Sequence, residues 1–104
     1  MEGTLSVNYS LAVRVVQYIV IANYEAFNPR TLNVKVGSTV FWLNLDSGND
    51  ATYTLTFDKI GVQSPVLNPA PNYDSFSHTF TTPGIYPYHC TCQVLINGTI
   101  IVTG

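Results

Sequence analysis

YPYHCTCQ, at residues 86–93, is the stretch that decides the fold. The tripeptide Pro83-Gly84-Ile85 precedes it and is typical of a tight turn that leads into a strand. Residues 98–102 follow it as an apolar segment that begins with glycine and forms the last strand. We expect Asn97 and Gly98 to form the turn into that strand. The stretch therefore places a soft thiolate, Cys90, at the end of a strand and beside a loop.

The rest of the chain carries the apolar–polar alternation that is typical of strands, and turn signals recur about every ten residues. The expected strands cover residues 32–36, 40–45, 52–57, 75–81, 85–90 and 98–102. Residues 61–73 contain three prolines and are expected to be irregular. Trp42 lies inside a predicted strand and is expected in the core. The pattern predicts a single all-β domain over residues 1–104, a β-sandwich of seven to eight strands.

The N-terminal segment, residues 1–22, has one apolar face. Its odd-numbered residues are apolar from Leu5 to Ile21, and Gln17 is the single break. Seventeen extended residues would span roughly 55 Å, which is long for a sandwich of this size. One interpretation is two strands joined at a bend, or one strand that switches sheets. The other is a strand extension whose first ten or so residues pair with another subunit.

Charge is scarce in this chain. Charged residues make up 10% of it, against a usual fraction of about 25%. The four basic and six acidic residues are scattered, so we expect neither nucleic acid nor an anionic membrane as a partner. A surface so poor in charge gives weak self-repulsion and favours association. It fits an extracellular or cell-surface protein.

No segment has the pattern of a membrane span or of a signal peptide. The most apolar run, residues 11–21, is too short for a span and contains Arg14 and Gln17. Glu2 stands where a leader would carry basic residues. Two glycosylation sequons, at Asn8 and Asn97, favour export.

Five short segments occur in a fixed order along the chain: AFNP at 26–29 with TLNVKVG at 31–37, VFWLNLD at 40–46, SFSHTF at 75–80, PGIYPYHC at 83–90 and GTIIV at 98–102. In this order they resemble the cupredoxins, the family of small blue copper proteins. The resemblance covers most of the chain and implies a Greek-key sandwich of eight strands. It also implies a copper site built from a His after the Trp-x-Asn strand, and from Cys, His and an axial Met in the last loop.

Only one of those ligands carries over to this chain. The family's Cys falls on Cys90, but the first His falls near Asp50 or Ala51, the second on Gln93 and the Met on Ile96. A blue-copper centre needs two imidazoles and a thiolate to hold copper through both oxidation states. The resemblance therefore implies a cupredoxin scaffold with an incomplete copper centre.

The two histidines of the chain are not expected to restore that centre. His89 precedes Cys90 on a strand, so the two side chains point to opposite faces. His78 lies in the SFSHTF strand, which the resemblance places far from the ligand loops.

The thiol pair Cys90 and Cys92 is the remaining chemical feature. On one strand the two side chains point the same way, and a bridge between them would close a strained ring. Soft thiolates favour Cu(I), so Cys90, Cys92 and Gln93 are the candidate metal-binding residues. The alternative is that Cys90 is a small buried hydrophobe and Cys92 a loop residue.

These observations predict a protein that is not an enzyme, because no nucleophile–base pair, phosphate loop or carboxylate pair is present in the sequence. We expect no catalytic residues, no small-molecule substrate and no cofactor, and a partner that is another copy of the chain or a different protein. Association would use donation of the N-terminal strand. The alternative is a copper protein, for Cu(I) storage, relay or electron transfer, that uses Cys90 and Cys92.

Overall fold

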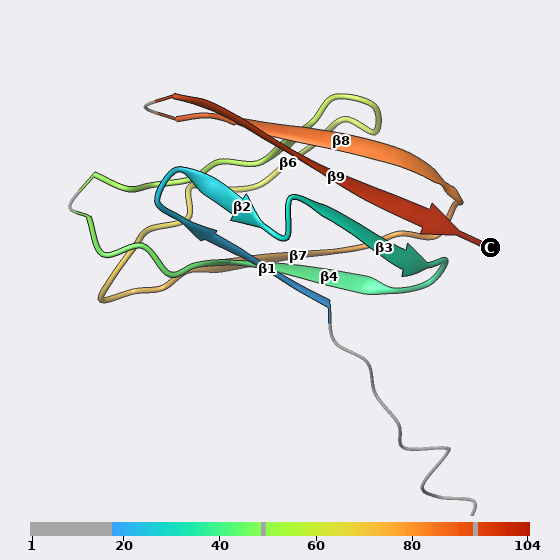
Figure 1. The fold of residues 1–104 in the computed structure, drawn as a ribbon, viewed down its shortest axis with the longest axis horizontal. Helices are drawn as coiled ribbons and strands as arrows, with labels where there is room; N and C mark the ends of the chain where they lie inside the picture. The colour runs from blue at the N-terminus through green and yellow to red at the C-terminus, as the bar shows by residue number, and fades with distance from the viewer. Residues whose placement is uncertain (1–17, 49, 93) are drawn as a thin grey trace, which may run out of the picture.

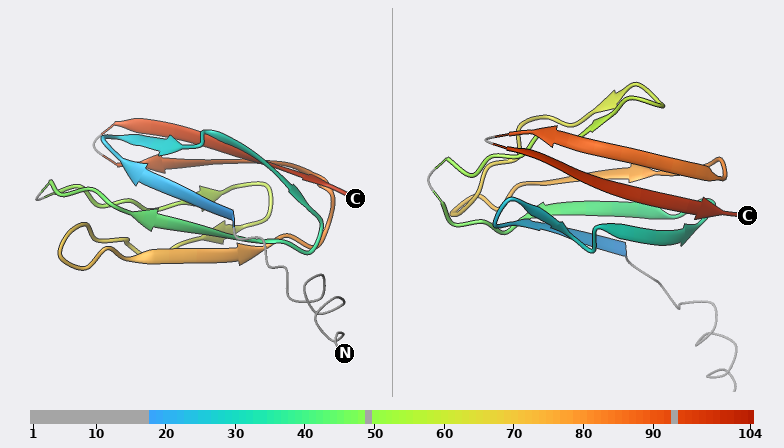
Figure 2. Two further views of the ribbon diagram at one scale, coloured as in Figure 1. Left: turned by 60° about the horizontal axis from the view of Figure 1, so that its bottom comes forward. Right: turned by 45° about the horizontal axis from the view of Figure 1, so that its top comes forward.

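The computed structural model describes residues 18–48, 50–92 and 94–104. Strands dominate this part of the chain, and it contains no helix. Figure 1 shows the strands in two layers, and the two views of Figure 2 show the same layers from other sides. The described strands are β1 (Tyr18–Asn23), β2 (Ala26–Asn28), β3 (Thr31–Lys35), β4 (Thr39–Asn44), β5 (Thr56–Phe57), β6 (Val62–Gln63), β7 (Ser75–Thr79), β8 (Gly84–Thr91) and β9 (Leu95–Thr103). The predicted all-β sandwich is confirmed.

The strands form a four-stranded sheet in the order β2-β1-β4-β7 and a five-stranded sheet in the order β3-β9-β8-β5-β6. β1 runs parallel to β4, and β3 runs parallel to β9. The remaining pairs of neighbours are antiparallel. Strands that are adjacent in the sequence are thus often not adjacent in a sheet, and the chain crosses repeatedly between the two layers.

The β8–β9 pair corrects one prediction. It runs from Gly84 opposite Val102 to Thr91 opposite Leu95. Asn97 and Gly98 therefore lie inside β9, opposite His89 and Tyr88, and do not form the turn into it. A methyl group on Gly98 would overlap the phenol ring of Tyr88, so this glycine is needed for close packing between the strands.

Aromatic rings fill the space between the sheets. Trp42 on β4 is fully buried, as predicted, and its ring meets those of Phe57 and Tyr88 edge-on at 5.4 and 5.5 Å. Phe57 and Tyr88 lie 4.9 Å apart. The indole N–H of Trp42 and the hydroxyl of Tyr88 are both buried without a hydrogen-bond partner. These three rings are therefore held by packing against one another rather than by hydrogen bonds of Trp42 and Tyr88.

Residues 52–57 form less strand than predicted. Only Thr56 and Phe57 belong to β5, and Tyr53 makes an isolated bridge to Leu67. The N–H of Leu55 donates to the side chain of Ser64 at 2.9 Å instead of to a neighbouring strand. A side chain from the proline-containing segment thus replaces part of a sheet ladder, which alternation alone does not reveal.

The end of the N-terminal segment enters the four-stranded sheet as β1. Val20 and Ala22 are buried in the core, whereas Ile19 and Ile21 point to the opposite face of the sheet. Residues 1–17, which hold the rest of the predicted strand extension, lie outside the described residues. Within the described ranges, no helix is long and apolar enough to cross a membrane.

Candidate functional site

Three connecting segments meet at one end of the sandwich, at the left of Figure 1. They are the β1–β2 turn, the loop after β4 and the β8–β9 turn, and they enclose a cleft of about 410 Å³. The residues that line the cleft are Tyr24, Glu25, Asp46, Gly48, Asp50, Ala51, Thr52, Tyr53, Cys92, Val94 and Ile96. The cleft therefore combines carboxylates, a phenol, aliphatic side chains and a sulfur atom.

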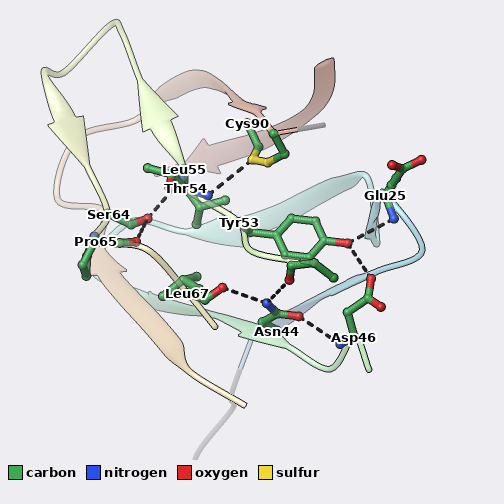
Figure 3. Close-up of a disulfide and its surroundings, with 12 residues drawn as sticks. Glu25, Asn44, Asp46, Tyr53, Thr54, Leu55, Ser64, Pro65, Leu67 and Cys90 are labelled. Carbon is green, nitrogen blue, oxygen red and sulfur yellow. Dashed lines mark hydrogen bonds between the residues drawn. A yellow bond between two sulfur atoms is a disulfide. The ribbon is translucent and has the colours of Figure 1, made fainter. Parts of the chain in front are cut away.

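The β1–β2 turn has an unusual backbone. Tyr24 and Glu25 both adopt the left-handed conformation, with φ of 52° and 57°. Residues other than glycine enter that region at a cost. The N–H of Tyr24 donates to Asp46 Oδ2 and the N–H of Glu25 donates to the hydroxyl of Tyr53, each at 3.0 Å. Two side chains from the adjacent loop thus hold the turn in place (Figure 3).

Asp46 is the centre of this network. Its Oδ2 also accepts the hydroxyl proton of Tyr53 at 3.0 Å, and its Oδ1 accepts the N–H of Gly48 at 3.1 Å. Burial raises the pKa of Asp46, but the hydrogen bonds from Gly48, Tyr53 and Tyr24 outweigh it and hold the pKa below its usual value. Burial raises the pKa of Tyr53 to about 12. The pair is therefore a carboxylate and a neutral phenol at neutral pH.

Asn44 fixes the loop that follows β4. Its side-chain amide donates to the carbonyl oxygens of Ala51 and Leu67, both at 2.8 Å, and its Oδ1 accepts the N–H of Asp46 at 2.9 Å. Since Asn44 is fully buried, these bonds are shielded from water. They hold Ala51, one of the two positions where the resemblance places a copper-binding His, at the wall of the cleft.

Cys90 and Cys92 are joined by a disulfide. The two side chains point the same way, as predicted, and their Cα atoms are 5.3 Å apart, within the usual range for bridged cysteines. The sulfur of Cys90 is fully buried and accepts the N–H of Thr54 at 3.3 Å (Figure 3). Cys92 is half-buried and lines the cleft. In this form neither sulfur is a free thiolate, and Gln93 lies outside the described residues.

Both histidines of the chain lie elsewhere. His89 points away from Cys90, and its Nδ1 is 3.7 Å from Asp58 Oδ2. The ring of His78 on β7 packs edge-on against Phe80 at 4.8 Å. Ile96 lines the cleft, where the resemblance places the axial ligand.

The donor set of this chain does not fit a blue-copper centre. That centre needs two imidazoles beside a thiolate. The sequence contains two imidazoles, and one lies beside Asp58 while the other packs against Phe80. Within residues 18–48, 50–92 and 94–104, no three His, Cys, Asp or Glu side chains are grouped so that they could hold a metal ion.

Comparison with known proteins agrees with the fold. Amicyanin from Paracoccus denitrificans is 32% identical over 73 residues, which cover 68% of this chain and 53% of amicyanin. A structure of a reduced Cu(I) form of an amicyanin variant superposes with a TM-score of 0.71 at 26% identity, over 90% of this chain and 89% of that one. The chain has the cupredoxin fold. The matched region of this chain spans about half the length of the curated relative.

A second solved structure shares the cupredoxin fold alone. The Cu-containing nitrite reductase NirK from Thermus scotoductus superposes with a TM-score of 0.73 at 22% identity, over 88% of this chain but 23% of the enzyme. No protein-family model matches the chain.

The sequence did not predict the network around Asp46. Asp46, Tyr53 and Glu25 are 7 to 28 positions apart, and the sequence predicted Tyr53 as part of a strand. One signal was available: Asn44 ends the strand that contains Trp42, and Asp46 follows it with one residue between them. Polar residues at that spacing can share one backbone turn, and here Asn44 accepts the N–H of Asp46.

Proposed function

We propose that this cupredoxin-fold protein is not an enzyme but an interaction module, exported or displayed at the cell surface, that lacks a type 1 copper centre and binds copies of itself. The observation that carries the proposal is an uncharged apolar surface on the outer side of the four-stranded sheet. The disulfide and the positions of the two histidines support the loss of the copper centre.

The outer apolar face is formed by Ile19 and Ile21 of β1 and by Phe41 and Leu43 of β4. Ile19 pairs with Phe41, and Ile21 pairs with Leu43, so the four side chains are contiguous. Ile19 is 44% exposed and Phe41 is 38% exposed. The four strands of this sheet contain no Asp, Glu, Lys or Arg. An uncharged apolar face of this kind is stabilised by burial against another surface.

A second copy of the chain is the partner that fits this face. Two identical uncharged faces meet without charge repulsion, and the scarcity of charge in the whole chain lowers the barrier further. The odd-numbered apolar alternation of the N-terminal segment continues through Ile19 and Ile21. We include donation of residues 2–12 to a neighbour's sheet edge in the proposal, since such a strand would extend the same apolar face.

The mass of the protein in solution tests this proposal. Phe41→Lys would convert the multimer to a monomer, because it places a charge in the centre of the face. Ile85→Lys is the matched control: Ile85 is 58% exposed, but it lies on β8 of the other sheet, and its variant would remain multimeric. Deletion of residues 2–12 would weaken the multimer. Native protein that sediments as a monomer at all concentrations would contradict the proposal.

A copper-binding role for the reduced protein is the second candidate. It is favoured by two adjacent sulfur atoms, of which that of Cys92 lines the cleft, and by the Cu(I) form of the amicyanin variant with a similar fold. Two thiolates suit Cu(I), and Gln93 could add a weak oxygen ligand. The test is metal analysis of the native protein, followed by addition of Cu(I) to the reduced form. Tight uptake that is abolished in Cys90→Ser would favour copper over the interaction module.

A further inference from the structure

The Cys90–Cys92 disulfide is asymmetric, and this asymmetry points to a chemical role beyond the proposed function. Cys90 belongs to β8 and is fully buried in the core. Cys92 lies past the end of β8, in the turn before β9, and is half-buried at the cleft. A molecule that enters the cleft therefore reaches the sulfur of Cys92 and not that of Cys90.

We propose that this disulfide is a thiol–disulfide exchange centre for thiols that carry a positive charge, in which Cys92 is attacked and Cys90 is the leaving group. Exchange proceeds by attack of a thiolate on one sulfur, and its rate depends on which sulfur is accessible and on how well the other leaves. The two sulfurs of this disulfide differ in their accessibility and in their surroundings as leaving groups.

The surroundings of Cys90 suit a leaving group. Its sulfur accepts the N–H of Thr54 at 3.3 Å, and a hydrogen bond to a sulfur atom favours the anionic form. This bond is already present in the oxidised protein, so no group has to move to stabilise the departing thiolate. Cys90 also stays fixed in its strand, whereas Cys92 belongs to a turn that is closed by its own N–H bonding to the carbonyl of Val94 at 3.3 Å.

The cleft selects for charge. Glu25, Asp46 and Asp50 contribute carboxylates to its lining, and no Lys or Arg is among the lining residues of the described chain. A thiol with a neighbouring ammonium group is attracted to such a site, whereas a thiol with a sulfonate or carboxylate is repelled. The lining also includes the aliphatic side chains of Val94 and Ile96, which can pack against the carbon part of the thiol.

The exchange balances without any other reactant. The incoming thiolate forms a bond to the sulfur of Cys92 while the bond between Cys92 and Cys90 breaks, and its electron pair leaves on Cys90. A second thiolate of the same class attacks the incoming sulfur of the mixed disulfide and releases Cys92. Two thiols are thus oxidised to one external disulfide, the protein disulfide is reduced to two thiols, and the two protons of the external thiols end on Cys90 and Cys92.

Reduction rates of the folded protein test the charge preference. The probes are cysteamine, a cationic thiol, and 2-mercaptoethanesulfonate, an anionic thiol. Rates are measured by mass spectrometry after an acid quench, and each rate is divided by the thiolate concentration. It is then divided by the rate at which the same thiol reduces the neutral 2-hydroxyethyl disulfide, which corrects for the intrinsic reactivity of the thiol. We expect cysteamine to react about five-fold faster at low salt, and the preference to vanish at about 1 M salt. Equal rates at low salt, or a disulfide that resists both thiols, would overturn the proposal.

A pair of charge-neutralising variants localises the effect. Glu25→Gln removes a carboxylate from the cleft and should reduce the preference for cysteamine. Asp58→Asn changes the net charge by the same amount on the opposite side of β8, beside His89, and should leave the preference unchanged. Equal effects of the two variants would show a response to net charge only and would contradict a selective cleft.

The position of the mixed disulfide tests the order of events. After brief reaction of the native protein with cysteamine and alkylation of free thiols, peptide mapping should find the cysteamine on Cys92 and the alkyl group on Cys90. In single variants, the thiol of Cys90→Ser should be alkylated roughly ten-fold or more faster than that of Cys92→Ser. Cysteamine on Cys90 in the native protein would refute the mechanism even if a variant failed to fold. These readouts do not depend on association, so the exchange and the proposed self-assembly can fail separately.

Discussion

At the scale of single residues, Gly98 and Tyr88 show how little free space the sandwich has. The two residues are directly opposite in the β8–β9 pair. Tyr88 is buried, and its ring occupies the space where a side chain at position 98 would begin. Glycine at position 98 is therefore set by the large ring across from it and not by a turn.

We predict that Gly98→Ala destabilises the protein by about 1–3 kcal/mol, because the added methyl group forces the ring of Tyr88 out of its place in the core. Urea unfolding measures the loss. Gly61→Ala is a useful comparison, since its left-handed backbone imposes a conformational cost but the site has open space. Full stability of Gly98→Ala would show that the two strands can separate without cost.

Asp46 gives a prediction about pH. The pKa of Asp46 in the folded protein lies below its usual value in an unfolded chain, so the carboxylate stabilises the fold fully above that usual value. This contribution is lost as the pH falls through the lower pKa of the folded state. The gap in unfolding free energy between the native protein and Asp46→Asn should therefore be largest above about pH 5 and should shrink toward pH 2–3. Urea unfolding at several pH values checks this, and a gap of constant size from neutral pH down to the acid limit would contradict it.

Residue-level features divide into those that alternation reveals and those that it does not. The burial of Cys90, its common direction with Cys92 and the opposite direction of His89 follow from the period of a strand. The Asp46 network joins residues up to 28 positions apart, and its geometry depends on how three loops fold together. No local pattern in the sequence encodes that.

At the scale of elements, the β1–β2 turn is held by the carboxylate of Asp46 and the hydroxyl of Tyr53. The phenol of Tyr53 donates to Asp46 and accepts the N–H of Glu25, so it satisfies two groups at a strained turn. The phenol of Tyr88 is also buried but has no such partners. Burial raises the pKa of Tyr88 to about 12, and the nearby indole of Trp42 acts in the opposite direction.

The two tyrosines form a matched pair of tests. Tyr53→Phe should lower the unfolding free energy by about 1–3 kcal/mol, because it leaves the N–H of Glu25 without its partner and removes one of the two hydrogen bonds to Asp46 Oδ2. It should also speed hydrogen exchange at the amide of Glu25. Tyr88→Phe should change stability little or raise it. A larger loss in Tyr88→Phe than in Tyr53→Phe would contradict the assignment of these bonds.

The strands themselves were predicted in part. The strand around Trp42 and the strand that ends near Cys90 are close to their predicted bounds, because alternation and clear turn signals define them. β9 is longer than predicted because Asn97 and Gly98 have turn-forming character that packing against β8 overrides. β5 is shorter than predicted because Ser64 takes up a backbone donor of that segment.

At the scale of the whole molecule, ordered motifs identified the fold better than any single element. Each motif alone is short, but their order matches two sheets in which β1 and β4, and β3 and β9, run parallel. The outer apolar face was not predicted. The odd-numbered residues of β1 are apolar, but so are the even-numbered residues Val20 and Ala22. The sequence therefore does not tell which side faces the core, and the structure shows that Val20 and Ala22 do.

The placement of β9 has a consequence for synthesis on the ribosome. β9 emerges after the other described strands, yet it lies between β3 and β8, and Thr31 pairs with Thr99, roughly seventy residues later. At about 5–20 residues per second, β3 waits several seconds for its neighbour. Until then Leu32 and Val34 lack the strand beside them, so the nascent chain is open to wrong pairings that a chaperone would have to suppress.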